Sequence, residues 1–166
     1  IEAGRIPGDM TKGLGWAQPF FLAYQGQCDR DLQTLFGELA VKVMAARYGE
    51  TELAAPPQSG EPIRVGIVSG FFFQHSVWKI GCKAWVTQLD RERFQVCGYS
   101  IGFRRDAETE VARQHCHRFI EGPRSLAEWR DIIAADKPHV LLYPEIDRKS
   151  TRLNSSHQII SYAVFC

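Results

Sequence analysis

Several common functional signatures are missing from this chain of 166 residues. It contains neither G-x-G-x-x-G nor G-x-x-x-x-G-K-[ST], so it lacks the glycine loops that bind dinucleotides and nucleoside triphosphates. Neither Ser69 nor Ser76 lies in the serine-hydrolase pattern G-x-S-x-G, and no Ser/His/Asp arrangement is apparent. No run of about eighteen apolar residues occurs, so we expect no transmembrane helix. The formal net charge of +1 gives no electrostatic sign of a nucleic-acid or membrane partner.

Cysteine is present but sparse, and its pattern excludes two further classes. The five cysteines are widely spaced and include no C-x-x-C pair. A disulfide framework and a zinc site are therefore both disfavoured, and reduced thiols in a cytoplasm fit better. His115 and His117 flank Cys116, but no partner pair lies nearby, so we expect no metal site there.

The last segment, residues 147–166, differs abruptly from the rest in composition. It reads DRKSTRLNSSHQIISYAVFC. Residues 147–157 match the translation of a common sequencing-library adapter residue for residue, and residues 160–166 match its continuation. We therefore expect this tail to be non-biological and exclude it from fold reasoning. The alternative is a genuine Ser/Asn-rich tail with an apolar end.

The composition of the remainder is that of a globular protein, with 45% hydrophobic and 23% charged residues in the whole chain. We divide it into an N-terminal extension, residues 1–55, and a lobe, residues 61–146, joined by a Pro/Gly/Ser linker. The extension is expected to hold one helix, from about Asp29 to Tyr48, with Asp29 as its cap and Gly49 at its end. Its apolar positions follow helical spacing: Leu32, Leu35, Phe36, Leu39, Val43 and Met44.

The lobe alternates short apolar runs with helical patterns. Strands are expected at residues 63–68, 93–101, 117–120 and 140–143. Helices are expected between them, at residues 77–89, 106–115 and 125–135. The first of these should bury one face, made of Trp78, Cys82, Trp85, Val86 and Leu89. This alternation predicts βαβ units, and hence an α/β fold with a Rossmann-like parallel sheet.

Parallel sheets bind ligands beyond the carboxyl ends of their strands, which directs attention to three loops: residues 69–76, 100–105 and 143–146. In the first, Ser69 and Gly70 end a strand, and His75 precedes a helix. His75 can act as a base or donate to a bound sugar or phosphate, or it can simply cap the helix. Asp131 and Glu145 are candidate acid/base carboxylates, although Asp131 has the simpler interpretation of a solvated helix charge.

The run from Ile63 to Ile80 resembles the start of the catalytic region of the O-GlcNAc transferase family (glycosyltransferase family 41), including bacterial SPINDLY-type members. These show R-V-G-(F/Y/I)-V-S, an aromatic-rich turn, a His and a helix. The resemblance covers roughly Pro19 to Ile146. In bacterial members the last strand resembles Y-P-E-(I/V) followed by Gly-Met-Asp, whereas Asp147 stands here in place of that Gly.

The resemblance implies an inverting glycosyltransferase of GT-B architecture, with this chain carrying the first lobe. The implied donor is a UDP-sugar, usually UDP-N-acetylglucosamine, and the implied acceptor is a Ser or Thr hydroxyl on a protein; no further cofactor is implied. His75 matches the His that lines the cleft in family members, and Asp131 matches an Asp placed near it. Ser69, Gly70 and Glu145 would then contribute to donor binding.

Most donor contacts in the family belong to a second lobe, whose positions do not occur in this chain, so little or no activity is expected of it alone. Family members often carry tetratricopeptide repeats upstream. A different class remains open, namely a non-catalytic binding or scaffolding domain with a flavodoxin-like sheet.

Overall fold

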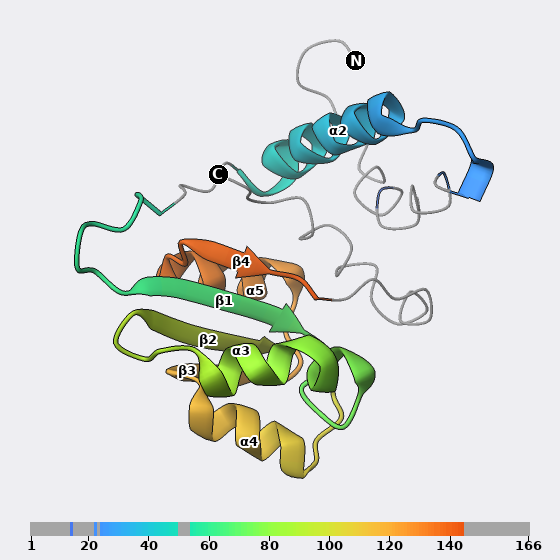
Figure 1. Cartoon of the computed structure of the whole chain (residues 1–166). Helices are drawn as coiled ribbons and strands as arrows, with labels where there is room; N and C mark the ends of the chain where they lie inside the picture. The colour runs from blue at the N-terminus through green and yellow to red at the C-terminus, as the bar shows by residue number, and fades with distance from the viewer. Residues whose placement is uncertain (1–13, 15–21, 23, 50–53, 145–166) are drawn as a thin grey trace. The chain divides into compact units, whose positions relative to one another are not determined.

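The computed structural model describes residues 14, 22, 24–49 and 54–144. The chain falls into two compact units that divide between residues 51 and 52. Figure 1 shows a single labelled helix in the first unit, and a sheet with its helices in the second.

The described part of the first unit is built around helix α2, Arg30–Tyr48. Gly49 ends the helix with a φ of 78°, a conformation that glycine adopts without strain. Asp29 occupies the N-cap position, but it makes no side-chain cap, and its carboxylate accepts instead from the Gln33 amide at 3.2 Å. The prediction of Asp29 as a capping side chain is therefore wrong.

The buried face of α2 is also rotated from the predicted one. Ala40 and Val43 are buried with Leu14, and Phe36 and Leu39 pack against them. These positions keep helical spacing, but Leu32 and Leu35 fall outside the stripe and are 56% and 61% exposed. Leu32 and Leu35 were predicted to join the apolar face, and in the structure they do not.

The second unit is a four-stranded parallel sheet in the order β3-β2-β1-β4. Its strands are β1, Ile63–Ser69; β2, Phe94–Ser100; β3, Arg118–Glu121; and β4, Val140–Leu142. Central pairing runs in register from Ile63 opposite Phe94 to Ser69 opposite Ser100. The predicted α/β class with a parallel, Rossmann-like sheet is confirmed.

Helices cover both faces of this sheet (Figure 1). Helix α3, Lys83–Gln88, and helix α4, Ala107–His115, lie on one face, where Val65, Ile67 and Val96 enter a core with Trp78 and Ala112. Helix α5, Leu126–Asp136, covers the opposite face, packing Trp129 and Ile133 against Val68 and Tyr99. Alternate strand residues point to opposite faces, so both faces can be buried at once.

A π-helical turn, η2, Trp78–Cys82, precedes α3 and changes the helical period expected for this segment. The backbone N–H of Lys83 bonds to the carbonyl of Trp78, five residues back. The buried positions are then Trp78, Cys82 and Val86, while Trp85 is 40% exposed. The prediction that Trp85 lies on the buried face is therefore wrong, because the extra residue in the turn rotates it outward.

Capping boxes start the two remaining helices. Asp106 opens α4 and Ser125 opens α5, and in each case the N-cap and N3 side chains bond to each other's backbone N–H. Such reciprocal caps satisfy donors that would otherwise lack partners at the helix start. Because α4 follows β2 and α5 follows β3 in a parallel sheet, both helices begin at the carboxyl edge of the sheet and run back toward its amino edge.

Candidate functional site

The loop after β1 begins with a buried turn at Ser69. This side chain is 1% exposed, and its hydroxyl oxygen accepts from the Phe71 N–H at 3.0 Å. Its carbonyl accepts from the Ile101 N–H at 3.0 Å, which extends the pairing of β1 and β2 past the strand ends. Ser69 was predicted as a ligand contact, and the structure shows that its hydroxyl shapes the loop from within.

His75 lies at the end of this loop, half-buried, directly before the first helical residues. Its ring stacks on that of Phe71, with centroids 4.0 Å apart and planes at 15°. Its Nδ1 accepts from the Val77 N–H at 3.2 Å, so the capping role considered from the sequence is present. An imidazole that accepts at Nδ1 carries its proton at Nε2 when neutral. Nε2 is then a hydrogen-bond donor, for which no partner occurs among the described residues.

The loops after β1 and β2 touch at their backbones. A side chain at Gly102 would overlap the backbone carbonyl of Gly70, so only glycine fits there. Gly70, another predicted contact, therefore lies where two strand ends come together. This close approach, which sequence reasoning missed, brings the second loop toward the first.

Asp106 joins the same two loops through its side chain. One carboxylate oxygen accepts from the N–H groups of Glu108 and Thr109, and the other accepts from the Gln74 N–H at 2.8 Å. These bonds lower the pKa of Asp106, the Gln74 N–H most of all, because each stabilises the ionised form. Sequence reasoning placed residue 106 at the start of a helix and gave Asp106 no role in the site; the D-x-x-T spacing at the helix start was the available signal.

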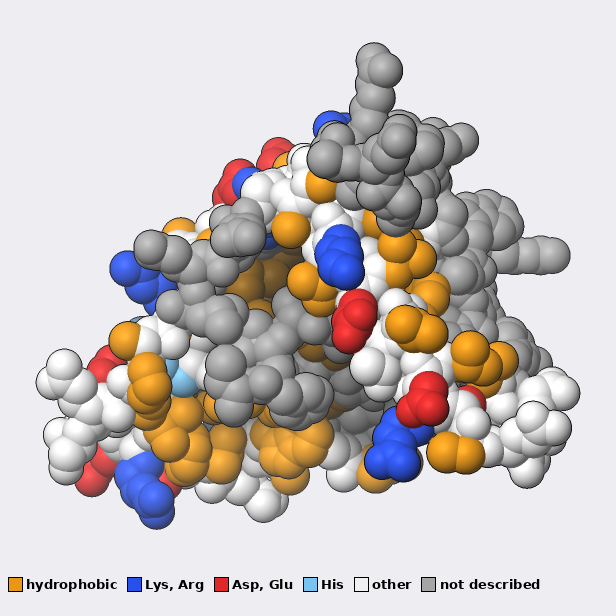
Figure 2. Space-filling view, turned by 90° about the horizontal axis from the view of Figure 1, so that it is seen from above, with side chains coloured by type: hydrophobic (Ala, Val, Ile, Leu, Met, Phe, Trp, Pro, Cys, Tyr) orange, Lys and Arg blue, Asp and Glu red, His pale blue; other side chains and the backbone are white. Residues whose placement is uncertain are grey.

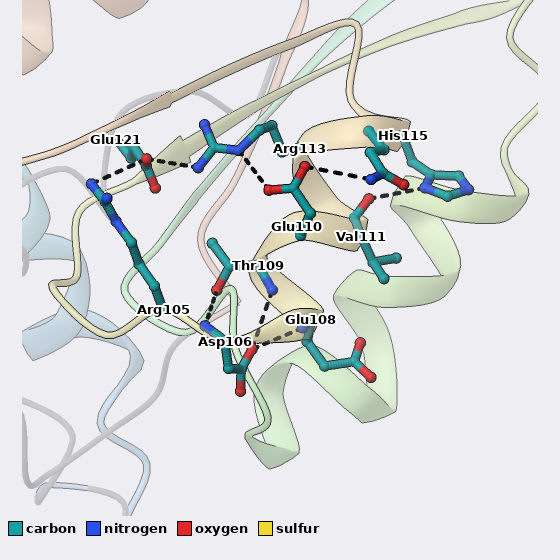
Figure 3. A network of polar contacts seen from close by, with 10 residues as sticks. Arg105, Asp106, Glu108, Thr109, Glu110, Val111, Arg113, His115 and Glu121 are labelled. Carbon is teal, nitrogen blue, oxygen red and sulfur yellow. Dashed lines mark hydrogen bonds and ion pairs between the residues drawn. The ribbon is translucent and has the colours of Figure 1, made fainter.

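Arginines surround this edge in two different settings. The guanidinium of Arg104 lies 4.7 Å from the centre of the Phe73 ring, a cation–π geometry. Arg105 and Arg113 both pair with Glu121, the last residue of β3, as Figure 3 shows. The second loop is thus tied to β3 by charge as well as to β1 by backbone. On the face shown in Figure 2, positive and negative side chains are interspersed with hydrophobic ones.

The loop after β4 is described only through Pro144. Tyr143 packs on the α5 side of the sheet, and its hydroxyl is buried without a hydrogen-bond partner among the described residues. Burial raises the pKa of this phenol. Glu145, a predicted binding residue, lies outside the described residues.

Asp131 is not brought to His75 in this unit. It lies in the middle of α5, its side chain is 65% exposed, and it pairs with the adjacent Arg130 at 2.7 Å. No contact within the described part of the chain links it to the loop after β1. A catalytic role for Asp131 stays a prediction.

Other titratable clusters serve the fold. His115 lies at the end of α4, with Nδ1 2.9 Å from the Val111 carbonyl oxygen. Within the described ranges, no group of three or more His, Cys, Asp or Glu side chains is arranged to hold a metal ion. Burial raises the pKa of the Cys116 thiol to about 12, which makes this cysteine a poor nucleophile. Among the residues described, no helix is long and apolar enough to cross a membrane.

The chain is similar in structure to an O-GlcNAc transferase from Thermobaculum terrenum, solved as a point mutant. The two share 26% identity with a TM-score of 0.50, over 64% of this chain and 21% of the other. The chain thus spans about a fifth of the length of that protein. No protein-family model matches the chain, and no curated protein sequence matches it. The Rossmann-like lobe described above therefore has a glycosyltransferase as a structural neighbour.

Proposed function

We propose that this chain is the first lobe of a GT-B glycosyltransferase of the O-GlcNAc transferase type. The proposed reaction transfers N-acetylglucosamine, or a related sugar, from a UDP-sugar to a Ser or Thr hydroxyl with inversion. The observation that carries the proposal is His75, held at the carboxyl end of β1 with Nε2 able to donate. The likeness to a glycosyltransferase of known structure supports the same reading.

The proposed role of His75 follows from its tautomer. With Nδ1 occupied by the Val77 N–H, the neutral ring donates through Nε2 rather than accepting there. A donor at this place suits a phosphate oxygen or a sugar hydroxyl, both of which accept hydrogen bonds. We therefore assign His75 to substrate positioning and charge stabilisation, and leave general-base work to another group.

The remaining predicted site residues take secondary places in this proposal. Ser69 and Gly70 give the loop its shape, because the Ser69 hydroxyl bonds to the Phe71 N–H inside the turn. Glu145 and Asp131 stay candidate carboxylates for the assembled site. A UDP-sugar donor and reduced thiols are compatible with a cytoplasmic enzyme, and upstream tetratricopeptide repeats remain part of the proposal.

The reaction also sets a requirement that one lobe does not meet. Departure of UDP needs cationic or backbone donors around the diphosphate, and both substrates must be held in line. We propose that a second lobe supplies the diphosphate contacts and is the principal partner of this chain. Purified chain alone is then expected to bind its donor weakly and to transfer no sugar to a Ser/Thr peptide.

A titration of the ¹⁵N-labelled chain with UDP-N-acetylglucosamine, followed by NMR, tests this proposal. Chemical-shift changes are expected in residues 69–76 and 100–106, and His75→Ala should abolish them. His115→Ala is the matched control, because His115 lies at the opposite end of α4, and it should leave the titration unchanged. Shift changes confined to another surface would favour a non-catalytic binding domain, and no change at millimolar donor would remove the support from His75.

A further inference from the structure

The two carboxylate oxygens of Asp106 serve different segments of the chain. Oδ1 accepts from the Glu108 N–H at 2.9 Å and from the Thr109 N–H at 3.2 Å, which caps α4. Oδ2 accepts from the Gln74 N–H at 2.8 Å, in the loop after β1. Capping α4 needs only one oxygen, so the second bond does something that the helix itself does not require. Figure 3 shows the capping half of this arrangement.

The Gln74 bond fixes the backbone immediately before His75. On the other side of His75, its carbonyl accepts from the Lys79 N–H at 2.9 Å, and its Nδ1 accepts from the Val77 N–H. The segment carrying the imidazole is thus held from both directions. The anchor on one side is local helical bonding, and the anchor on the other is Asp106, whose position is fixed by α4.

Electrostatics strengthen the Asp106 anchor. The first turn of a helix presents unpaired N–H groups and favours a negative charge. Accepting from three backbone N–H groups lowers the pKa of the Asp106 carboxyl, so it is ionised at neutral pH. Hydrogen bonds to an ionised acceptor are stronger than neutral ones. The bond to Gln74 therefore restrains this part of the loop more firmly than an amide–carbonyl contact would.

We propose that Asp106 is a positioning residue for His75, holding the imidazole so that its Nε2–H faces the carboxyl edge of the sheet. Asp106 acts through the backbone of Gln74 and contacts no ligand itself. The functional meaning of this restraint rests on the role proposed above for His75.

Asp106→Asn separates the two roles. With its amide oxygen in place of Oδ1, asparagine still caps α4 well. Its NH₂ then faces the Gln74 N–H, two donors that cannot bond. Thr109→Val is the matched control, because it removes the Thr109 hydroxyl bond to the Asp106 N–H at 3.1 Å and leaves the Gln74 contact in place.

The readouts are amide hydrogen exchange and imidazole ¹⁵N shifts in the whole chain at neutral pH. In Asp106→Asn, exchange at Gln74 is expected to accelerate roughly tenfold, the effect of losing one net hydrogen bond. The His75 ring ¹⁵N shifts should move from the pattern of a single Nε2–H tautomer toward an average of both. Exchange at Glu108 and Thr109 should stay slow, and Thr109→Val should leave the His75 signals unchanged.

An asparagine that flips its amide would instead keep Gln74 protected and expose Glu108 and Thr109, and that pattern is visible in the same spectra. Asp106→Ser then decides, because serine caps the helix and has no second oxygen for Gln74. Unchanged His75 tautomer signals in Asp106→Ser, with α4 intact, would overturn the proposal. These spectra need no ligand, so the result is independent of whether the chain binds a UDP-sugar.

Discussion

The two edges of the sheet each carry a histidine, and the two rings are held differently. At the amino edge, the His139 side chain is 4% exposed. Its Nδ1 accepts from the Arg64 N–H at 3.0 Å, and its Nε2 lies 2.7 Å from the Arg64 guanidinium. At the carboxyl edge, His75 uses one ring nitrogen and is half-buried. A ring with both nitrogens occupied joins strands, whereas a ring with one open nitrogen is available to a ligand.

The surroundings of the two rings extend this contrast. Arg64 also pairs with Glu61 and donates to the Lys137 carbonyl, so the amino edge is closed by short contacts between β1 and the residues before β4. The carboxyl edge is built from loops held by Asp106 and by the approach of Gly102 to Gly70. The histidine of the amino edge is thus enclosed by contacts within the fold, whereas the candidate site lies at the carboxyl edge, as expected for a parallel sheet.

Gly102→Ala should have the largest effect on stability, because the two loops of the carboxyl edge approach each other most closely at this residue. Its new methyl group would overlap the Gly70 carbonyl, and backbone on both sides leaves no cheap adjustment. We expect a loss of about 3 kcal/mol in the free energy of unfolding, measured by urea denaturation. Gly66→Ala is the control, because its methyl would meet side chains and no backbone, the Leu141 side-chain end at 2.7 Å and the Tyr99 ring at 3.0 Å, and it should cost less. Equal losses would contradict this explanation.

His139→Ala should come next in magnitude. It leaves the Arg64 N–H without its acceptor at Nδ1, removes the ring that contacts the Arg64 guanidinium, and opens space in a nearly buried position. The expected loss is about 2 kcal/mol in the free energy of unfolding. Hydrogen exchange should show the loss first at the pairing of β1 with β4. A loss no larger than that of His75→Ala would erase the distinction between the two edges.

Acid should weaken both edges by a smaller amount. The pKa values of Glu61, Asp106 and Glu108 are all lowered, by hydrogen bonds from Gln58, Gln74 and Lys83 respectively as the largest cause. Carboxyls with lowered folded-state pKa values stabilise the fold above their ordinary values of 4.5 and 3.8 and lose that contribution as pH falls through the folded values. The free energy of unfolding should therefore decline below about pH 4.5. Asp106→Asn should flatten this decline, and an unchanged slope would contradict the assignment.

His75→Ala should have the smallest effect on stability, below about 1 kcal/mol, because it removes one acceptor at a helix start and one ring stack. The stack on Phe71 lies at the loop surface, so neighbouring side chains can adjust. Denaturation of His75→Ala beside His139→Ala measures the comparison directly. A large loss in His75→Ala would assign this ring to the fold rather than to a ligand.

Much of the lobe was predictable because local signals and burial agree. Short β-branched runs became strands, and Ser125 with Glu128 made the expected capping box. The wrong predictions concern which helix residues are buried, and they arose where the helix departs from the regular α-helical period or where packing buries a different face. The π-helical turn at Trp78–Cys82 rotates Trp85 outward, and the described neighbours of α2 select a stripe that omits Leu32 and Leu35.

The candidate site was predictable only in outline. His75 follows from its place after a strand, since ligand loops in parallel sheets follow the carboxyl ends. The structural roles of Asp106 and Gly102 could not be predicted from the sequence, because each depends on a partner about thirty positions away. The tautomer of His75, too, depends on a backbone N–H that only the folded loop brings to Nδ1.

By itself, the sequence determined the alternation of strands and helices, the parallel sheet and the loop that carries His75, because each is encoded by hydrophobic period and capping within a few neighbouring residues. The tertiary structure alone decided that both ring nitrogens of His139 contact Arg64, whereas only one ring nitrogen of His75 has a partner among the described residues. It also decided that the Asp106 carboxylate holds the loop after β1. Those outcomes depend on hydrogen bonds between distant segments, and such bonds have no local sequence pattern until the sheet brings their partners together.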